Sequence, residues 1–196
     1  MVRRVTLDTN CLLDLEERTE RAPAVRALIS LHNTGDLTLS VPAIMASERQ
    51  RGGVYLSSFA EFTDRLSSLG VGHLPLLPPM GYWDVGFWDH MLWTDDAMIE
   101  FERQIHDVLH PDIQFEYGDH CRELAIGPEA MPPERRWRNA KCDAQVLWSH
   151  IHHGGELLVT NHLNFIKQSK LPRLIELGAG AIVQTHAALA LLDAAP

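Results

Sequence analysis

Short apolar runs alternate with amphipathic segments along this chain of 196 residues, and this alternation constrains its fold more than any other feature. The apolar runs are continuous, as expected for strands that are buried on both faces of a sheet. The expected strands cover residues 2–7, 37–41, 157–160 and 181–183. The expected helices cover residues 23–32, 42–48, 55–69, 95–109 and 139–152, with one more near the C-terminus. The pattern predicts an α/β fold with a parallel sheet that helices cover on both faces.

The composition excludes several classes of protein. With 45% hydrophobic and 22% charged residues, the chain is neither disordered nor fibrous. No apolar run approaches the roughly 20 residues that cross a bilayer, and the first residues hold no signal-peptide core. Three cysteines, an odd number without CxxC spacing, predict a reduced cytosolic protein.

The net charge of −9 by itself argues against nucleic acid as a ligand, because phosphates repel a negatively charged protein. The distribution of the charged residues along the chain weakens that argument. Eleven acidic residues and two arginines lie between Asp84 and Glu123, and the rest of the chain is neutral. Basic residues gather in two other places, directly after Glu48 and shortly before Asp143. The candidate RNA-binding residues are Arg49, Arg51, Arg135, Arg136, Arg138 and Lys141. Trp137, within the second basic group, is a candidate for stacking on a base.

The acidic segment also carries Trp83, Trp88 and Trp93 at intervals of five residues. These rings either stack on bases or pack onto the domain or a partner, and the neighbouring aspartates favour packing because they repel phosphates. His106 and His110, and the histidines of residues 150–153, lack the acid or cysteine that would complete a zinc site. We expect them to be surface or capping residues.

Three acids from separate predicted elements are candidates for one site. Asp8 ends the first strand, Glu48 lies in the helix after the second, and Asp143 lies in the first turns of a later helix. Because sites form at the carboxyl ends of parallel strands, we expect these carboxylates to gather there. Carboxylates that gather repel one another unless a hard cation such as Mg²⁺ or Mn²⁺ neutralises them.

Four segments in this order resemble the PIN domain family. They are Leu7-Asp8-Thr9-Asn10, Ser47-Glu48, Asp143-Ala144-Gln145, and residues 157–165 with the sequence LLVTNHLNF. The resemblance implies a three-layer α/β/α sandwich with a central, mainly parallel sheet. It also implies a ribonuclease dependent on Mg²⁺ or Mn²⁺, in a family that includes toxins of bacterial toxin–antitoxin pairs. Asp8, Glu48 and Asp143 would then be the catalytic, metal-binding acids, and Asn10 would brace Asp8.

The sequence departs from the family pattern in two places. His162 stands where the family usually has an acid after the late strand, and Asn164 stands where a second acid often lies. Both can still bind a metal or its water, beside the supporting residues Thr160 and Asn161, but the site loses negative charge. Residues 79–123 resemble an insertion into a single domain that spans residues 1–196.

We therefore expect a metal-dependent ribonuclease that hydrolyses single-stranded or loop RNA. The alternative is a catalytically weakened PIN-like module that binds RNA or a protein. Beyond RNA, an antitoxin-like or other protein and a second copy of the chain are the candidate partners, and no membrane is expected. A phosphatase of the haloacid dehalogenase type would need a second aspartate where Asn10 lies, and no GxxxxGK loop indicates nucleotide hydrolysis.

Overall fold

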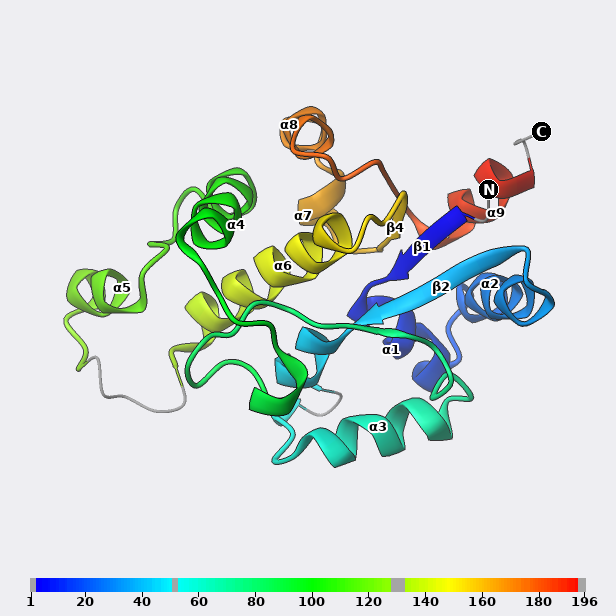
Figure 1. The fold of residues 1–196 in the computed structure, drawn as a ribbon, viewed down its shortest axis with the longest axis horizontal. Helices are drawn as coiled ribbons and strands as arrows, with labels where there is room; N and C mark the ends of the chain where they lie inside the picture. Colours follow the sequence, from blue (N-terminus) through cyan, green and yellow to red (C-terminus); the bar gives the residue numbers. More distant parts are fainter. Residues whose placement is uncertain (1–2, 51–52, 128–132, 194–196) are drawn as a thin grey trace.

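A computed structural model describes residues 3–50, 53–127 and 133–193. Within these residues the strands form one parallel sheet in the order β3-β2-β1-β4-β5 (Figure 1). The strands are β1 (Arg3–Leu7), β2 (Leu37–Pro42), β3 (Leu76–Leu77), β4 (Leu157–Val159) and β5 (Ala181–Val183). Val5, Thr6 and Leu7 are all buried although successive side chains point to opposite faces, so both faces of the sheet are covered. The α/β fold class is confirmed.

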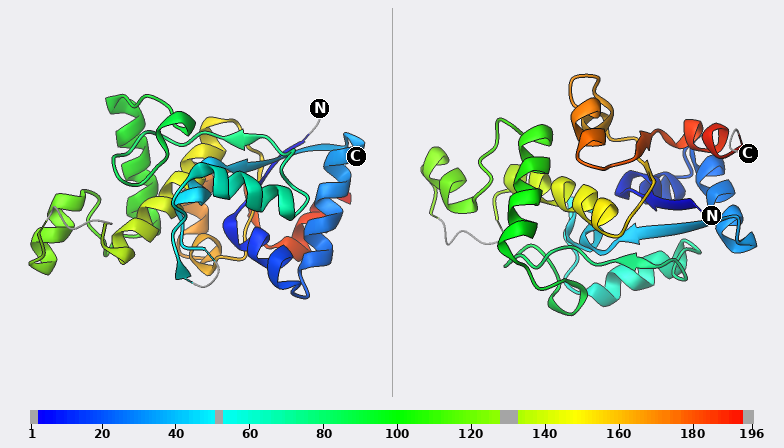
Figure 2. Two further views of the ribbon diagram at one scale, coloured as in Figure 1. Left: turned by 90° about the horizontal axis from the view of Figure 1, so that it is seen from below. Right: turned by 45° about the horizontal axis from the view of Figure 1, so that its top comes forward.

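Helices flank this sheet on both sides. The helices are α1 (Thr9–Glu17), α2 (Ala22–Thr34), η1 (Ala43–Ser47), α3 (Phe59–Ser68), η3 (Trp88–His90), α4 (Asp96–Leu109), α5 (Tyr117–Leu124), α6 (Arg135–His152), α7 (Leu163–Ile166), α8 (Leu171–Glu176) and α9 (Thr185–Asp193). Helix α2 packs on α1, β2 and α9, whereas α6 packs on η1, β2 and α4 (Figure 2). No helix in the described part of the chain has both the length and the apolar surface to span a membrane.

The expected helix over residues 42–48 is wrong. A short 3₁₀ helix, η1, ends at Ser47, and Glu48 follows it with an extended backbone. Side chains bind carbonyls of this segment: the nearby Gln50 Nε2 donates to the carbonyls of Met45 and Glu48, at 3.0 and 2.7 Å. Arg138 Nε donates to the Ser47 carbonyl at 3.0 Å. Two local hydrogen bonds from Gln50 and one long-range bond from Arg138 therefore satisfy carbonyls at the end of η1, where the expected α-helix does not form.

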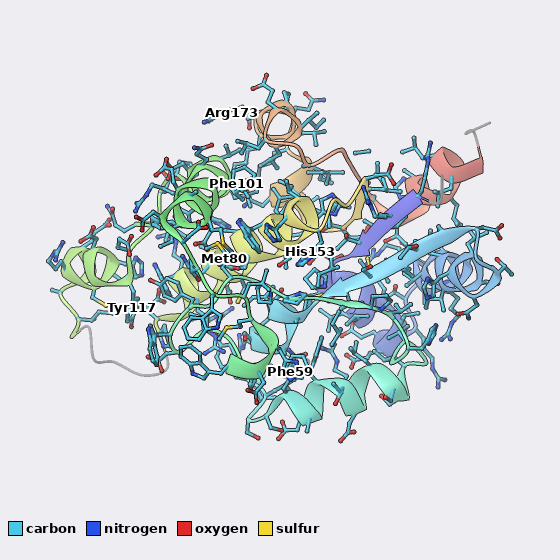
Figure 3. The ribbon with its side chains drawn as sticks, viewed as in Figure 1. Phe59, Met80, Phe101, Tyr117, His153 and Arg173 are labelled. Atoms are coloured by element: carbon cyan, nitrogen blue, oxygen red, sulfur yellow. The ribbon has the colours of Figure 1, made fainter. Side chains whose placement is uncertain are left out.

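Residues 79–123 pack closely against the rest of the structure. Met80, Val85 and Ile105 belong to the same hydrophobic cluster as the strands. Figure 3 shows Met80 beside α6 and Phe101 on α4, and the Met80 amide donates to Gln145 Oε1 on α6 at 3.0 Å. Helix α5 lies far from the sheet (Figure 1). That this segment is an insertion into a single domain remains a prediction.

A buried ion pair joins α4 to α6. Lys141 Nζ lies 2.7 Å from Glu102 Oε2, and the two side chains are 0% and 1% exposed. Gln145 Nε2 donates to the other oxygen of Glu102 at 2.8 Å, and the Lys141 ammonium lies 4.0 Å from the centre of the Phe115 ring. Burial raises the pKa of Glu102 and lowers that of Lys141, and the attraction between the two charges opposes both shifts.

Replacing Lys141 alone should destabilise the protein strongly. Lys141→Met leaves Glu102 buried without its counter-charge, and we expect a loss of about 3–5 kcal/mol in the free energy of unfolding. The double variant Lys141→Met/Glu102→Gln removes both charges and keeps an acceptor for Gln145, so most of the loss should be recovered. Urea denaturation measures both values. A double variant as unstable as the single one would show that packing, not charge, accounts for the loss.

Candidate functional site

The centre of the candidate site lies where β1 and β4 end. The chain fills the sheet from β1 outward through β2 and β3, then returns to place β4 on the other side of β1. Ligands of open parallel sheets bind at such a switch point, beyond the carboxyl ends of the strands. Leu7 pairs with Val159, and the Asp8 amide donates to the Val159 carbonyl at 3.0 Å. Asp8 and Thr160 are therefore neighbours at this edge.

Three donors fix the Asp8 carboxylate. Its Oδ1 accepts from the Thr9 amide at 2.7 Å, because Asp8 is the N-cap of α1. Its Oδ2 accepts from Asn10 Nδ2 at 2.7 Å and from Thr160 Oγ1 at 2.5 Å. Asn10 and Thr160 thus hold Asp8 from the two strand ends that meet here.

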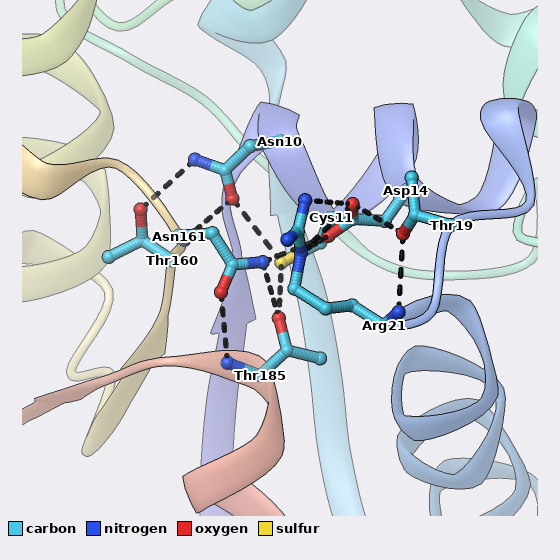
Figure 4. Close-up of polar contacts among 8 residues, drawn as sticks. All are labelled: Asn10, Cys11, Asp14, Thr19, Arg21, Thr160, Asn161 and Thr185. Atoms are coloured by element: carbon cyan, nitrogen blue, oxygen red, sulfur yellow. Dashed lines mark hydrogen bonds and ion pairs between the residues drawn. The ribbon is translucent and has the colours of Figure 1, made fainter.

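A second layer of hydrogen bonds holds Asn10 (Figure 4). Asn10 Oδ1 accepts from the Asn161 amide at 2.8 Å. Asn161 Nδ2 donates to Asp14 Oδ2 at 2.9 Å and to Thr185 Oγ1 at 2.7 Å. This network ties α1 to the loop after β4 and to the start of α9.

Glu48 comes to the site from the end of η1. Its Oε1 is buried and has no hydrogen-bond partner among the residues that the structure describes. Thr9 Oγ1 is likewise buried without a hydrogen-bond partner among these residues. A buried carboxylate oxygen without a donor is rare in native structures and calls for an explanation.

Asp143 comes from α6, which starts at Arg135 and so places this acid well inside the helix rather than in its first turns. Asp143 Oδ2 lies 2.9 Å from His110 Nε2 and 3.6 Å from His162 Nδ1. His110 caps the end of α4, so the acidic segment contributes directly to the site.

The three acids line one open cleft of about 740 Å³. His162 and Asn164 line it too, and so do the basic residues Arg49, Arg136, Lys167 and Lys170. Carboxylates thus share the cleft with basic side chains, an arrangement suited to a ligand that carries phosphates.

Burial and repulsion between carboxylates raise the pKa values of Asp8 and Glu48. Burial, followed by the charges of Asp8 and Asp143, raises the pKa of Glu48 well above its ordinary range. Burial also raises the pKa of Asp8; the hydrogen bond from Thr160 opposes this, and the charge of Asp143 adds to it. A cation between these side chains would favour their charged forms.

The donor chemistry fits a hard divalent cation, although the side chains are not gathered around one point. Within the described ranges, no three His, Cys, Asp or Glu side chains form a group that could hold a metal ion as they stand. Mg²⁺ and Mn²⁺ prefer carboxylate oxygens, and the buried Oε1 of Glu48 is such an oxygen without a donor. Asp8, Glu48 and Asp143 would supply the ligands.

Asn164 is less free to bind a metal than its sequence position implies. Its Nδ2 donates to the Leu109 carbonyl at 2.9 Å, and its Oδ1 accepts from Lys170 Nζ at 2.5 Å. His162 is more open, with 44% of its side chain exposed.

The predicted RNA-binding residues divide into two groups. Arg49 and Arg136 are exposed and line the cleft, whereas Arg135 is exposed outside its lining. Arg138 and Lys141 are buried, so the prediction that they contact RNA is wrong: Arg138 holds the Ser47 carbonyl and Lys141 pairs with Glu102. Arg51 lies outside the described residues.

Three further predictions about aromatic residues and histidines are corrected. Trp137 is buried, with its indole Nε1 donating to the Phe115 carbonyl at 3.2 Å, so it does not stack on a base. His106 and His150, which we expected to be surface or capping residues, are buried. Trp83, Trp88 and Trp93 are exposed, so they do not pack onto the domain, whereas their packing onto a partner remains a prediction.

His110, Lys167 and Lys170 line the cleft but were missing from the predicted site. Each comes from a segment with no recognisable motif, and the His110–Asp143 contact spans 33 positions in the sequence. The proline directly after His110 signals a helix end there, but not what lies against it.

No model of a known protein family matches this chain, and no curated protein matches it. Among solved structures, VapBC2 from Rickettsia felis, bound to a DNA fragment from their promoter, is similar with a TM-score of 0.44. The two chains are 10% identical, and the match covers 94% of this chain and 98% of the other. A likeness of this degree does not assign the chain to a family.

Neutralising Glu48 should stabilise the protein at neutral pH. Because the pKa of Glu48 is higher in the folded chain than in the unfolded one, the folded state binds more protons between the two values. Stability is therefore greatest below the ordinary glutamate range and falls as the pH rises through that window. We expect Glu48→Gln to gain on the order of 1 kcal/mol at pH 7 and nothing at acidic pH. Thermal unfolding across pH measures this.

Glu20→Gln, at an exposed acid of the same type, is the matched control. An equal gain from both variants would attribute the effect to the overall negative charge rather than to the cleft.

Proposed function

We propose that the protein is a metal-dependent endoribonuclease that hydrolyses phosphodiester bonds in single-stranded or loop RNA. One observation carries the proposal: Asp8, Glu48 and Asp143, from three separate elements, line one cleft that also holds basic residues. The buried Oε1 of Glu48 adds a ligand atom that the protein itself leaves without a donor. The choice of RNA rests on the resemblance of the sequence to the PIN domain.

Each group of residues has a defined task in this proposal. Asp8 is held by Thr9, Asn10 and Thr160, so its oxygens enter the cleft in one fixed orientation. Arg49 and Arg136, both exposed in the lining of the cleft, would bind phosphates of the RNA. A Mg²⁺ or Mn²⁺ ion held by Asp8, Glu48 and Asp143 would supply charge neutralisation and activate water for attack on the phosphodiester.

A binding module without catalysis is the second candidate. The observation that favours it is the engagement of Asn164 by Lys170 and by the Leu109 carbonyl, where the family often has an acid. The family pattern has one or two further acids, at the positions of His162 and Asn164. With only three acids, the cleft holds less negative charge to attract a cation. Such a module would bind RNA through the same basic residues.

Cleavage should depend on Asp8. We expect purified protein with Mn²⁺ to cut end-labelled structured RNAs, and Asp8→Asn to abolish the cut while leaving the fold intact. Asp64→Asn, at an exposed acid on α3, is the matched control and should cut at the rate of the unaltered protein. RNA that is bound but uncut would support the binding module, and equal cutting by Asp8→Asn would identify a contaminating nuclease.

Cation binding can be measured without activity. A Mn²⁺ ion that binds the folded state in preference to the unfolded state should raise the melting temperature of the unaltered protein. The rise should be lost in Glu48→Gln and Asp143→Asn, and kept in Asp64→Asn. An equal rise in all four proteins would place the cation elsewhere and remove the three acids from the proposal.

A further inference from the structure

Three tryptophans stand in solvent on the acidic segment. Trp83, Trp88 and Trp93 are 72%, 52% and 94% exposed. Groups of large apolar side chains on a protein surface often mark interaction sites. Tryptophan is among the side chains most enriched at the positions that contribute most of the binding energy of protein interfaces. Neither the cleft nor the proposed nuclease activity uses these rings.

Two of the three rings are in contact, and the third comes from a neighbouring stretch of backbone. Trp83 and Trp88 contact each other edge to face, with ring centres 4.3 Å apart. Backbone hydrogen bonds of 2.9 Å from Gly81 to Leu92 and of 2.8 Å from Leu92 to Pro79 place residues 92–94 beside residues 79–81. Trp93 therefore stands next to the turn that carries Trp83.

Poor packing of the segment does not explain this exposure. Met80 and Val85 of the same segment are buried in the core. Phe87 and His90 contact the ring of Phe59 on α3, and His90 stacks on it with ring centres 3.4 Å apart. The segment thus buries its smaller apolar side chains and leaves its three largest rings outside.

Exposed carboxylates lie next to the three tryptophans in the sequence. We define the Trp–Asp surface by Trp83, Trp88, Trp93, Asp84, Asp89, Asp95 and Asp96, all of them exposed. Asp95 caps α4 by accepting from the Met98 amide at 2.8 Å, and Asp96 lies in the first turn of that helix, so both have a local structural role. Asp84 and Asp89 have no comparable helix-capping role, and the sequence has no lysine or arginine between Arg65 and Arg103.

We propose that the Trp–Asp surface binds an arginine- or lysine-rich peptide segment of a protein partner. The charge of the surface selects the ligand: its aspartates repel a phosphate backbone and attract cationic side chains. Tryptophan faces bind guanidinium and ammonium groups more strongly than other rings do. Exposed tryptophans with exposed aspartates as sequence neighbours therefore suit a peptide rich in basic side chains.

The test uses the full-length protein and a fluorescein-labelled peptide of repeating Arg-Gly-Ala units. Anisotropy measures binding, and the emission of the exposed tryptophans should shift on binding while Trp137 and Trp148 stay buried. We expect Trp83→Ala/Trp88→Ala to weaken binding roughly tenfold. A peptide of repeating Glu-Gly-Ala units should not bind.

The matched control for charge compares two double variants. Asp84→Asn/Asp89→Asn should weaken binding, whereas Glu17→Gln/Glu20→Gln, which removes two exposed charges elsewhere, should not. Asn suits position 84, whose backbone has a φ of 59°, so the first variant keeps its turn. Equal weakening by both would reduce the effect to overall charge and overturn the proposal.

Three other outcomes would also overturn it. Loss of peptide binding in Asp8→Asn would place the peptide in the cleft. Single-stranded RNA bound by the unaltered protein and lost in Trp83→Ala/Trp88→Ala would make the rings a base-stacking surface. Dissociation of a dimer by the same tryptophan variant, in sedimentation experiments, would identify a second copy of the chain as the occupant.

Discussion

The position of β1 between β2 and β4 governs the arrangement of every candidate site residue. Parallel pairing on both sides makes three strand ends share one edge, and the segments that follow these strands carry Asp8, Glu48 and Thr160. Helix α6 runs back to β4 and brings Asp143 to the same edge. A one-residue change of register in β1 would reverse which face each of its side chains points to, and Asp8 would no longer line the same cleft as Glu48 and Asp143.

The buried carboxylates of the candidate site lower the stability of the folded protein at neutral pH. Asp8 and Glu48 both have raised pKa values, chiefly through burial, and Asp143 adds repulsion to both. Hydrogen bonds from Thr160 and Thr9 partly offset this for Asp8, whereas Glu48 Oε1 receives none. Local conflict of this kind is typical of functional sites, and it contrasts with the buried pair of Lys141 and Glu102, whose opposite charges are in contact.

Sequence patterns predicted the features that depend on local periodicity. The strands 37–41, 157–160 and 181–183 and the helix 95–109 were found within a residue or two, because their apolar patterns are strong. Helix α1 was missed because the strand residues before it obscured its start at Asp8. The burial of Lys141 could not be foreseen, since its partner Glu102 lies 39 positions away and a basic cluster is usually exposed. His110 was missed for a similar reason, because Asp143, which it contacts, lies 33 positions away in the sequence.

The ion pair between Glu102 and Lys141 has a consequence for how the molecule opens. Lys141 lies two residues before Asp143, and Glu102 lies on α4 two turns before His110, so one buried contact and the candidate site share the same two helices. Separating α4 from α6 would expose both charges and would also part His110 from Asp143. Local opening of the acidic segment is therefore coupled to disassembly of the cleft. Amide hydrogens on the facing sides of α4 and α6 should exchange as one cooperative unit rather than helix by helix.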